Sequence, residues 1–354
     1  MRPARLALRT LVVAIVLGLT AGALSACSNG TGDADTVTLI THDSFVISKP
    51  VQRAFETSTG LRLRILRSGD AGAALNQVIL TRDRPLGDAF FGVDNTLLSR
   101  ALAARVFERY RPAGATSIPS DLVIDRTGHV TSIDYGDVCV NYDAAYFAAG
   151  EERALPEDLE ELAEGRFAKL LVVENPATSS TGLAFMLASI ARFGDGWLDW
   201  WAALRDGGVK VVEGWEQAYN AEFSGSAGKG EYPLVVSYAT SPPAEVIYAD
   251  PKPATAPTGN LDRTCFRQVE TVGVLRNAEH PEAARTLIDF LLTERFQADV
   301  PLGMFVYPVR PGTPVPPEFE RYAGRPADPF SVPPAAIARN RDRWIEQWDA
   351  TVLR

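Results

Sequence analysis

The sequence is poor in the residues on which metal, redox and nucleophilic chemistry depend. Its 354 residues include only three histidines and three cysteines, and it has no HExxH, CxxC, Walker or Gly-x-Ser-x-Gly motif. Asp43 and Ser44 follow His42, but neighbouring residues of an extended strand point to opposite faces and cannot form a catalytic relay. No cluster of Tyr, His or carboxylate residues has the spacing of a metal site. We therefore predict a protein that is not an enzyme and has no cofactor or metal.

Long apolar runs are also scarce, because only residues 11–24 form one, behind Arg2, Arg5 and Arg9. This run is too short for a comfortable membrane span and ends in Leu-Ser-Ala-Cys, which resembles a bacterial lipobox. The pattern predicts a signal peptide over 1–26, a lipidated Cys27 and a flexible tether over 27–35. We expect an exported protein anchored by lipid to the outer face of the cytoplasmic membrane. The alternative is ordinary secretion with cleavage after Ala26.

Positive charge is in deficit, since the formal net charge is −9. This balance argues against nucleic acid and against an anionic lipid surface as partners. Cys139 and Cys265 both lie in strand-like surroundings, and an exported protein folds in an oxidising compartment. We predict a disulfide between them, with two free thiols as the alternative.

Strand-like and helix-like segments alternate along the chain. Strands are expected at 36–40, 61–66 and 88–93, with helices at 51–58 and 71–81 between them. A second unit follows, with strands at 138–142, 170–173, 209–211 and 234–238, an acidic helix at 155–164 and an apolar helix that ends at Phe193. A Pro-, Ala- and Asp-rich connection over 250–262 is expected to lead to a further strand, CFRQVETVGVL, and helices at 281–292 and 337–353 complete the chain. The pattern predicts an α/β fold of mostly parallel sheets flanked by helices, with two lobes and a cleft between them.

The chain is expected to cross between the lobes near Tyr135 and near Cys265. Lobe 1 then comprises 36–134 and about 267–310, lobe 2 comprises 135–266, and 311–354 form a C-terminal helical segment that packs on the lobes.

Aromatic and acidic residues gather in the loops that follow the apolar runs. Such loops suit a flat organic cation, because rings offer π faces and carboxylates offer charge. Trp197, Trp200 and Trp201 lie at helical spacing and are assigned to the core instead. The candidate ligand-binding residues from these loops are His42, Asp43, Asp94, Tyr135, Trp215, Tyr238, Ser241, Phe305 and Tyr307.

Seven segments in this order, THDSF, GVDNTLL, DYGD, NPATSSTGL, GWEQAY, SYATSP and GMFVYPV, together resemble the thiamine-binding substrate proteins of bacterial ABC importers. The resemblance spans residues 41–309 and implies a type II, periplasmic-binding-protein-like fold. It implies that Asp94 meets the amino-pyrimidine or positive end of the ligand and that Trp215 and Tyr238 stack on it. Ser179, Ser180, Thr181 and Gly182 correspond to a phosphate-side loop, and the free N–H groups of a helix start suit that role.

Three positions depart from the family pattern. His42 stands where the family usually has Tyr, Phe305 stands where it has Trp, and Ala244 stands where an aromatic residue is expected. Each change removes ring area or alters polarity, and His42 adds a possible pH dependence because its cation would repel a thiazolium.

The resemblance implies three partners, namely thiamine or thiamine phosphate, an ABC permease and the ATPase of that permease. The chain is expected to be a monomer. Two alternatives stay open, a binder of another small solute in the same fold and a secreted enzyme. A polyamine would need carboxylates strung along the cleft, and a ferric ion would need paired tyrosines.

Overall fold

The computed structural model describes residues 35–148, 153–227 and 229–354. The predicted signal peptide at 1–26 and the predicted lipidation site, Cys27, lie outside the described residues. Within the described part, no helix combines the length and the apolar character needed to cross a bilayer.

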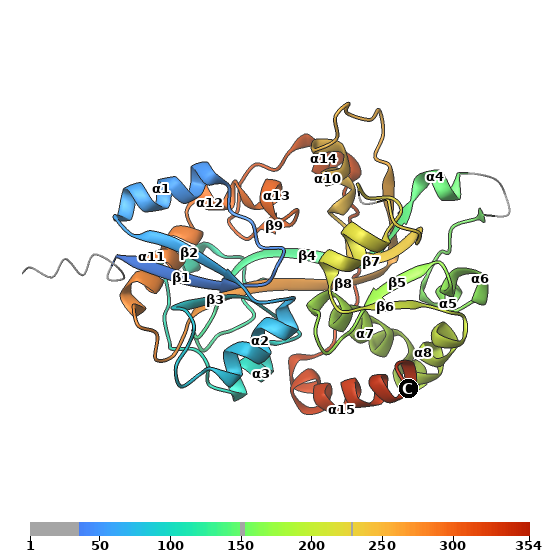
Figure 1. Ribbon diagram of the computed structural model, residues 1–354, viewed down its shortest axis with the longest axis horizontal. Helices are drawn as coiled ribbons and strands as arrows, with labels where there is room; N and C mark the ends of the chain where they lie inside the picture. Colours follow the sequence, from blue (N-terminus) through green and yellow to red (C-terminus); the bar gives the residue numbers. More distant parts are fainter. Residues whose placement is uncertain (1–34, 149–152, 228) are drawn as a thin grey trace, which may run out of the picture.

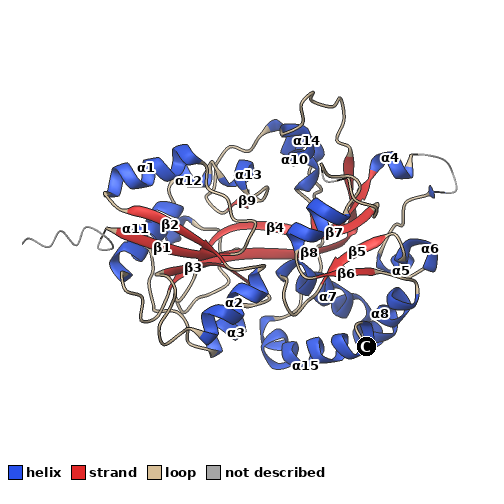
Figure 2. Cartoon of the chain, viewed as in Figure 1, coloured by secondary structure: helices blue, strands red, loops and turns tan. Residues whose placement is uncertain are grey.

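A single mixed sheet runs through the described chain from one end of the molecule to the other (Figures 1 and 2). Its strand order is β2-β1-β3-β8-β4-β7-β5-β6, and β9 pairs with β4 beside this path. The strands are β1 (Thr36–Thr41), β2 (Arg62–Arg67), β3 (Ala89–Asp94), β4 (Thr131–Asp143), β5 (Leu171–Glu174), β6 (Lys210–Val212), β7 (Leu234–Tyr238), β8 (Thr258–Val274) and β9 (Tyr307–Pro308).

The outer strands of the sheet are parallel, and its centre is antiparallel. β1 pairs in parallel with β2 and β3, and β5 pairs in parallel with β6 and β7. The long strands β4 and β8 run antiparallel to each other and to β7 and β3. The sheet is thus more mixed than the predicted mostly parallel arrangement, because the two strands that connect the halves run in opposite directions.

Helices cover both faces of this sheet (Figure 1). α1 ends at Gly60, whose positive φ of 75° is the left-handed conformation in which glycine commonly stops a helix. The helices are α1 (Lys49–Thr59), α2 (Ala71–Leu80), α3 (Leu98–Ala103), η1 (Ala113–Ser117), α4 (Ala144–Phe147), α5 (Leu159–Leu162), α6 (Gly165–Ala168), α7 (Ser180–Phe193), η3 (Gly194–Gly196), α8 (Trp197–Asp206), α9 (Trp215–Gln217), η4 (Ala218–Glu222), α10 (Ser241–Ile247), α11 (Pro281–Leu291), α12 (Glu294–Gln297), α13 (Val300–Gly303), α14 (Pro317–Tyr322) and α15 (Pro334–Val352).

Two local expectations need correction. The acidic segment at 155–164 forms only the single turn α5, and α6 follows it after a break, because the Asp158 side chain caps a helix that begins only at Leu159. β8 begins at Thr258, inside the stretch read as a Pro-, Ala- and Asp-rich connection, because pairing with β4 supplies its hydrogen bonds.

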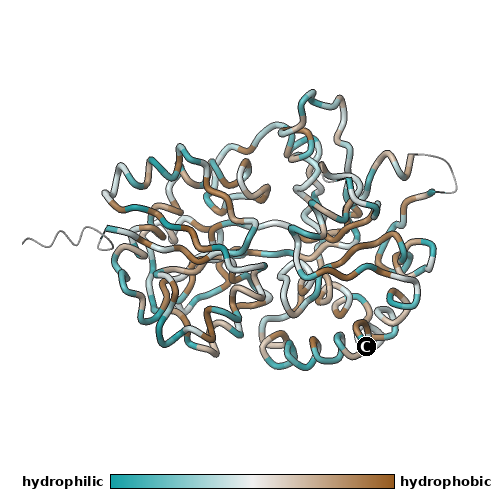
Figure 3. The backbone as a smooth tube through the Cα atoms, in the orientation of Figure 1, coloured by the Kyte–Doolittle hydropathy of each residue, from teal (hydrophilic) through white to brown (hydrophobic). Residues whose placement is uncertain are grey.

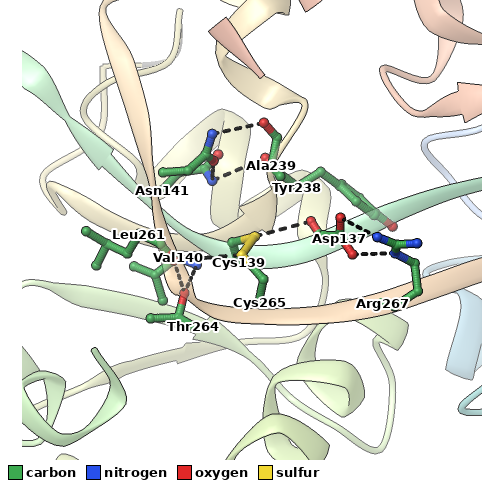
Figure 4. The surroundings of a disulfide bond; sticks show 11 residues. Asp137, Cys139, Val140, Asn141, Tyr238, Ala239, Leu261, Thr264, Cys265 and Arg267 are labelled. Carbon is green, nitrogen blue, oxygen red and sulfur yellow. Dashed lines mark hydrogen bonds and ion pairs between the residues drawn. A yellow bond between two sulfur atoms is a disulfide. The ribbon is translucent and has the colours of Figure 1, made fainter. Parts of the chain in front are cut away.

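A disulfide joins the two central strands (Figure 4). Cys139 of β4 and Cys265 of β8 are bonded, as the sequence predicts. The strand register shifts here, and the Thr264 hydroxyl fills the gap by donating to the Leu261 carbonyl at 2.7 Å and accepting the Val140 N–H at 2.9 Å. The cross-link therefore lies at an irregular point of the strand pair that connects the two halves of the sheet.

The core lies between the sheet and its helices, as the apolar stretches along the strands indicate (Figure 3). Trp197, Trp200 and Trp201 are buried, which confirms their assignment to packing. The Trp201 ring meets Trp348 of α15 edge to face, with centroids 5.4 Å apart. α15 packs against α8 and also reaches α3, so the C-terminal helix contacts elements from both halves of the chain.

Candidate functional site

A cavity of about 310 Å³ has walls from both halves of the sheet. One wall comes from the loop after β1, the start of α2, the middle of β8 and the segment 303–306. The other comes from the start of α7, from α9 and η4, and from the end of β7 with α10. This volume lies at the small end of the range of roughly 300–1,000 Å³ that is usual for small-molecule sites.

Aromatic rings form one wall of the cavity. Trp215 and Tyr219 stack with centroids 5.2 Å apart and planes 11° from parallel, and Tyr238 lies 6.3 Å from Trp215. The Trp215 indole N–H donates to the Ser237 hydroxyl at 2.8 Å, which fixes the orientation of the ring. The wall therefore presents π faces in a defined geometry before any ligand arrives.

Phe305 and Tyr248 line the cavity from its two opposite walls. Their rings meet edge to face with centroids 5.5 Å apart, and the Tyr248 hydroxyl donates to the Leu302 carbonyl at 2.6 Å. Phe305 has a φ of 55°, which is unusual for a bulky residue and costs conformational energy. Strain of this kind, at a cavity residue, is typical of a binding site.

Asp70 is the carboxylate at the junction of three helix starts. It caps α2 by accepting the Ala71 N–H at 2.6 Å, and it also accepts the Ser180 N–H of α7 at 3.3 Å and the Trp215 N–H of α9 at 2.9 Å. Burial raises the pKa of Asp70, and the N–H donors, Trp215 first, oppose that rise. This residue thus joins the two walls and presents negative charge to the cavity.

Besides Asp70, the cavity wall contains a second charged group, which consists of His42 and Glu270. The His42 Nε2 atom lies 3.3 Å from Glu270 Oε1. Burial lowers the pKa of His42, but the charge of Glu270 and the hydrogen bond to it outweigh burial, so that the net shift is upward. The imidazole fits because residue 92 is glycine: a Cβ there would lie 2.9 Å from the His42 ring, and the φ of Gly92 is 120°.

Asp134 supports this pair from inside the sheet. It is fully buried beside Glu270, and neither of its oxygens has a donor partner. Burial and the neighbouring carboxylate raise the pKa of Asp134 well above its usual value. The environment therefore favours the neutral form of Asp134 over its charged form.

The charge of the cavity wall is strongly one-sided. Four carboxylates, those of Asp70, Glu216, Glu245 and Glu270, and one imidazole line it, and none of the described lining residues is Lys or Arg. Such a wall stabilises a cation and disfavours an anion. The described chain holds no group of three or more His, Cys, Asp or Glu residues arranged to bind a metal ion.

Several predicted residues come together in this cavity, and others do not. The seven that line it are His42, Ser180, Thr181, Trp215, Tyr238, Ser241 and Phe305.

The prediction for Asp94 needs correction, because this residue does not line the cavity. It is fully buried, and its carboxylate accepts the Thr96 N–H and hydroxyl, the Leu97 N–H and the Gln268 amide. Burial raises the pKa of Asp94 to about 6. The carboxylate is fully engaged by its own turn and by β8, so Asp94 acts as a structural cap.

Tyr135 and Tyr307 also lie outside the lining. Side chains alternate along β4, and Asp134 and Gly136 face the cavity side, so Tyr135 faces the other way. There it stacks on Tyr307, with centroids 5.4 Å apart, beneath the Arg267 guanidinium.

Three further predicted residues stand behind or beside the cavity. Asp43 is exposed and is not among the residues that line the cavity. Ser179 caps α7, and Gly182 packs so closely against β5 that a Cβ would lie 2.4 Å from the Glu174 carbonyl oxygen. Both support Ser180 and Thr181 without forming the wall.

Sequence reasoning missed Asp70, Glu245 and Glu270. Asp70 carries the same signal as Asp94, since each lies at or just beyond the end of a strand and ahead of a helix. Glu270 is an acid within the buried stretch of β8 from residue 268 to residue 274, and a buried acid is itself a signal of function. Glu245 lies one residue beyond Ala244, the position where an aromatic residue was expected.

Residues 86–341 match the model of a family described as bacterial extracellular solute-binding protein. The chain belongs to this family. Two relatives are named thiamine-binding periplasmic protein: that of Escherichia coli K12 is 29% identical over 90% of this chain and 94% of its own length, and that of Brucella suis is 28% identical over 90% and 93%. A solved structure titled periplasmic thiamin binding protein superposes with a TM-score of 0.78 at 26% identity, over 90% of this chain and 96% of that one.

Membership of the solute-binding family agrees with the geometry. The sheet with two helix-covered halves is the two-lobed type II fold predicted from the sequence, and the chain is an exported protein. These two relatives are named as binding proteins and not as enzymes.

Proposed function

We propose that this protein captures thiamine, or a thiamine phosphate, outside the cytoplasm and delivers it to an ABC permease with its ATPase. The main observation behind the proposal is the cavity, which is lined by the Trp215 and Tyr238 rings and by the Asp70 and Glu270 carboxylates. None of its lining residues in the described part of the chain is Lys or Arg. A planar, positively charged heterocycle matches both features. The names of the relatives support the same ligand.

Each part of such a ligand has a suitable partner. A thiazolium ring is stabilised by an indole face, which contributes roughly 0.5 to 2 kcal/mol. The exocyclic amino group of an amino-pyrimidine donates hydrogen bonds, and the Asp70 and Glu270 carboxylates accept them. Ser241, which is hydrogen-bonded to Ser237 at 2.8 Å, adds a polar group at the same wall.

The proposal includes how the protein reaches its membrane partner. A lipid on Cys27 would hold a monomer at the outer face of the cytoplasmic membrane, with 27–35 as the tether. Lobe 1 (36–134 and about 267–310) and lobe 2 (135–266) would close on the ligand, with 311–354 packed on both. The absence of catalytic motifs supports a transport role without catalysis.

Native purification followed by mass spectrometry of the released small molecules tests the ligand directly, and calorimetry with thiamine measures its affinity. Trp215→Ala should weaken thiamine binding about three- to thirtyfold, because the indole face is lost. Tyr322→Ala is the matched control, since it removes a ring from α14, outside the cavity lining. Wild-type protein that fails to bind thiamine would refute the proposal.

A further inference from the structure

Tyr248 lies at the rim of the cavity, directly after the last turn of α10. It lines the cavity, yet 61% of its surface is exposed. Its hydroxyl donates to the Leu302 carbonyl at 2.6 Å, and its ring meets the Phe305 ring edge to face. Leu302 belongs to α13 and Phe305 to the segment 303–306, so both partners come from the wall opposite α10. Both contacts therefore cross the rim from one wall to the other.

The segment around α13 is fixed from behind by backbone contacts. Asp299, directly before α13, accepts the Ser48 N–H at 2.7 Å with its carboxylate. Gly303 lies so close to the loop after β1 that a Cβ there would stand 3.1 Å from the Val46 carbonyl oxygen. The φ of Phe305 is 55°, a strained conformation that persists only where the surroundings hold it. The Phe305 ring therefore depends on its neighbours for its position, and the ring at the end of α10 is one of them.

The helix α10 is also fixed on its own side of the cavity. Pro242 and Pro243 are buried in its first turn, where their rings restrict the backbone. The Tyr248 N–H donates to the Ala244 carbonyl at 3.1 Å, so these two residues lie one turn apart on the same face of the helix. Ala244 is the lining position at which an aromatic residue was expected. The ring on this face of α10 comes from Tyr248 instead.

We propose that Tyr248 is a positioning residue that clamps the rim of the cavity: it ties α10 to the opposite wall, holds the Phe305 ring in place and slows the release of thiamine. The proposal rests on the proposed function, which supplies the ligand. A ligand enclosed between the two walls leaves only when the rim opens, and opening breaks both contacts. Loss of these contacts is therefore expected to raise mainly the dissociation rate.

Release of isotopically labelled thiamine into an excess of unlabelled thiamine measures the dissociation rate, and calorimetry gives the equilibrium affinity. In Tyr248→Ala both contacts are lost, and dissociation should be about five- to thirtyfold faster than in wild-type protein. In Tyr248→Phe the ring stays and only the hydrogen bond to Leu302 is lost, so dissociation should be about two- to fivefold faster. The association rate, obtained from the two measurements, should not fall.

A double-mutant cycle with Phe305→Ala separates clamping from direct contact with the ligand. Because the ring contact is already missing in Phe305→Ala, adding Tyr248→Ala there should accelerate release about two- to fivefold less than it does in wild-type protein. Tyr322→Ala is the matched control, because the Tyr322 hydroxyl also donates to a backbone carbonyl, that of Ala254 at 3.3 Å, but lies outside the cavity lining. It should leave the dissociation rate unchanged, and thermal melting verifies that every variant is folded.

An unchanged dissociation rate in folded Tyr248→Ala overturns the clamp while the proposed function stands, and so does a loss of affinity that comes only from slower association. Fully additive effects of Tyr248→Ala and Phe305→Ala overturn the positioning of Phe305 by Tyr248. Wild-type protein that binds no thiamine overturns the proposed function and this inference together.

Discussion

Asp70 and Asp94 offer a direct comparison, because each lies at or just beyond the end of a strand and ahead of a helix, but only Asp70 lines the cavity. In Asp70→Asn the amide group replaces one carboxylate oxygen and faces an N–H donor of either Ser180 or Trp215. The substitution removes a charged acceptor that faces the ligand. A lost charge-assisted hydrogen bond costs about 1.5 to 3 kcal/mol, which corresponds to roughly a ten- to 150-fold weaker affinity for thiamine.

Asp94→Asn is the matched variant for this comparison. Its carbonyl oxygen can still accept from Thr96 and Leu97, which caps the turn, so thiamine affinity should change by less than about threefold. Calorimetry on both variants, with thermal melting as a control of folding, decides between the two acids. The reasoning is refuted if Asp94→Asn loses affinity while Asp70→Asn retains it.

Three further results are expected. Thiamine affinity should fall as the pH is lowered below neutral. Burial raises the pKa of Asp70, so this carboxylate loses its negative charge at a higher pH than an ordinary Asp, and the charge of Glu270 outweighs burial in raising the pKa of His42, so its imidazole becomes a cation at a higher pH than usual; a flat calorimetric profile would contradict this. Replacing Cys139 and Cys265 by Ala should lower the free energy of unfolding by about 2 to 4 kcal/mol in urea, since the bond closes a long loop; two thiols titrating in unreduced, denatured protein would argue against the bond. Cys27→Ala should move the protein from the membrane fraction to the soluble fraction, and persistent membrane association would exclude lipid anchoring at this residue.

Much of the fold follows from local patterns. The strands near 36–40, 88–93 and 234–238 and the helices near 71–81 and 281–292 form where the sequence predicts them. The strands are short apolar runs that are buried on both faces, and the helices each bury an apolar face. The acidic segment at 155–164 was less predictable, since charged helices depend on packing for most of their stability. The beginning of β8 at Thr258 depends on its partner β4, which lies far away in the sequence.

The sequence by itself determined which residue types a ligand would meet. Rings and acids at the ends of apolar runs indicated His42, Trp215, Tyr238 and Phe305 as candidate ligand-binding residues, and all four line the cavity. The sequence does not show on which face of the sheet the Tyr135 side chain lies, because that face is set by the register of β4 against β8.

Tertiary structure alone decided which acids serve the site. A carboxylate before a helix looks the same in sequence whether it caps its own turn, as Asp94 does, or also binds the helix starts of another segment, as Asp70 does. The local sequence indicates that both acids can cap a turn. The contact of Asp70 with a distant helix start depends on how α2 packs against residues more than one hundred positions away. The Ala73 N–H, for example, donates to the Thr178 carbonyl at 2.9 Å. Contacts over such separations are set by the packing of the whole sheet and its helices, so the charge pattern of the cavity emerges only when the chain is folded.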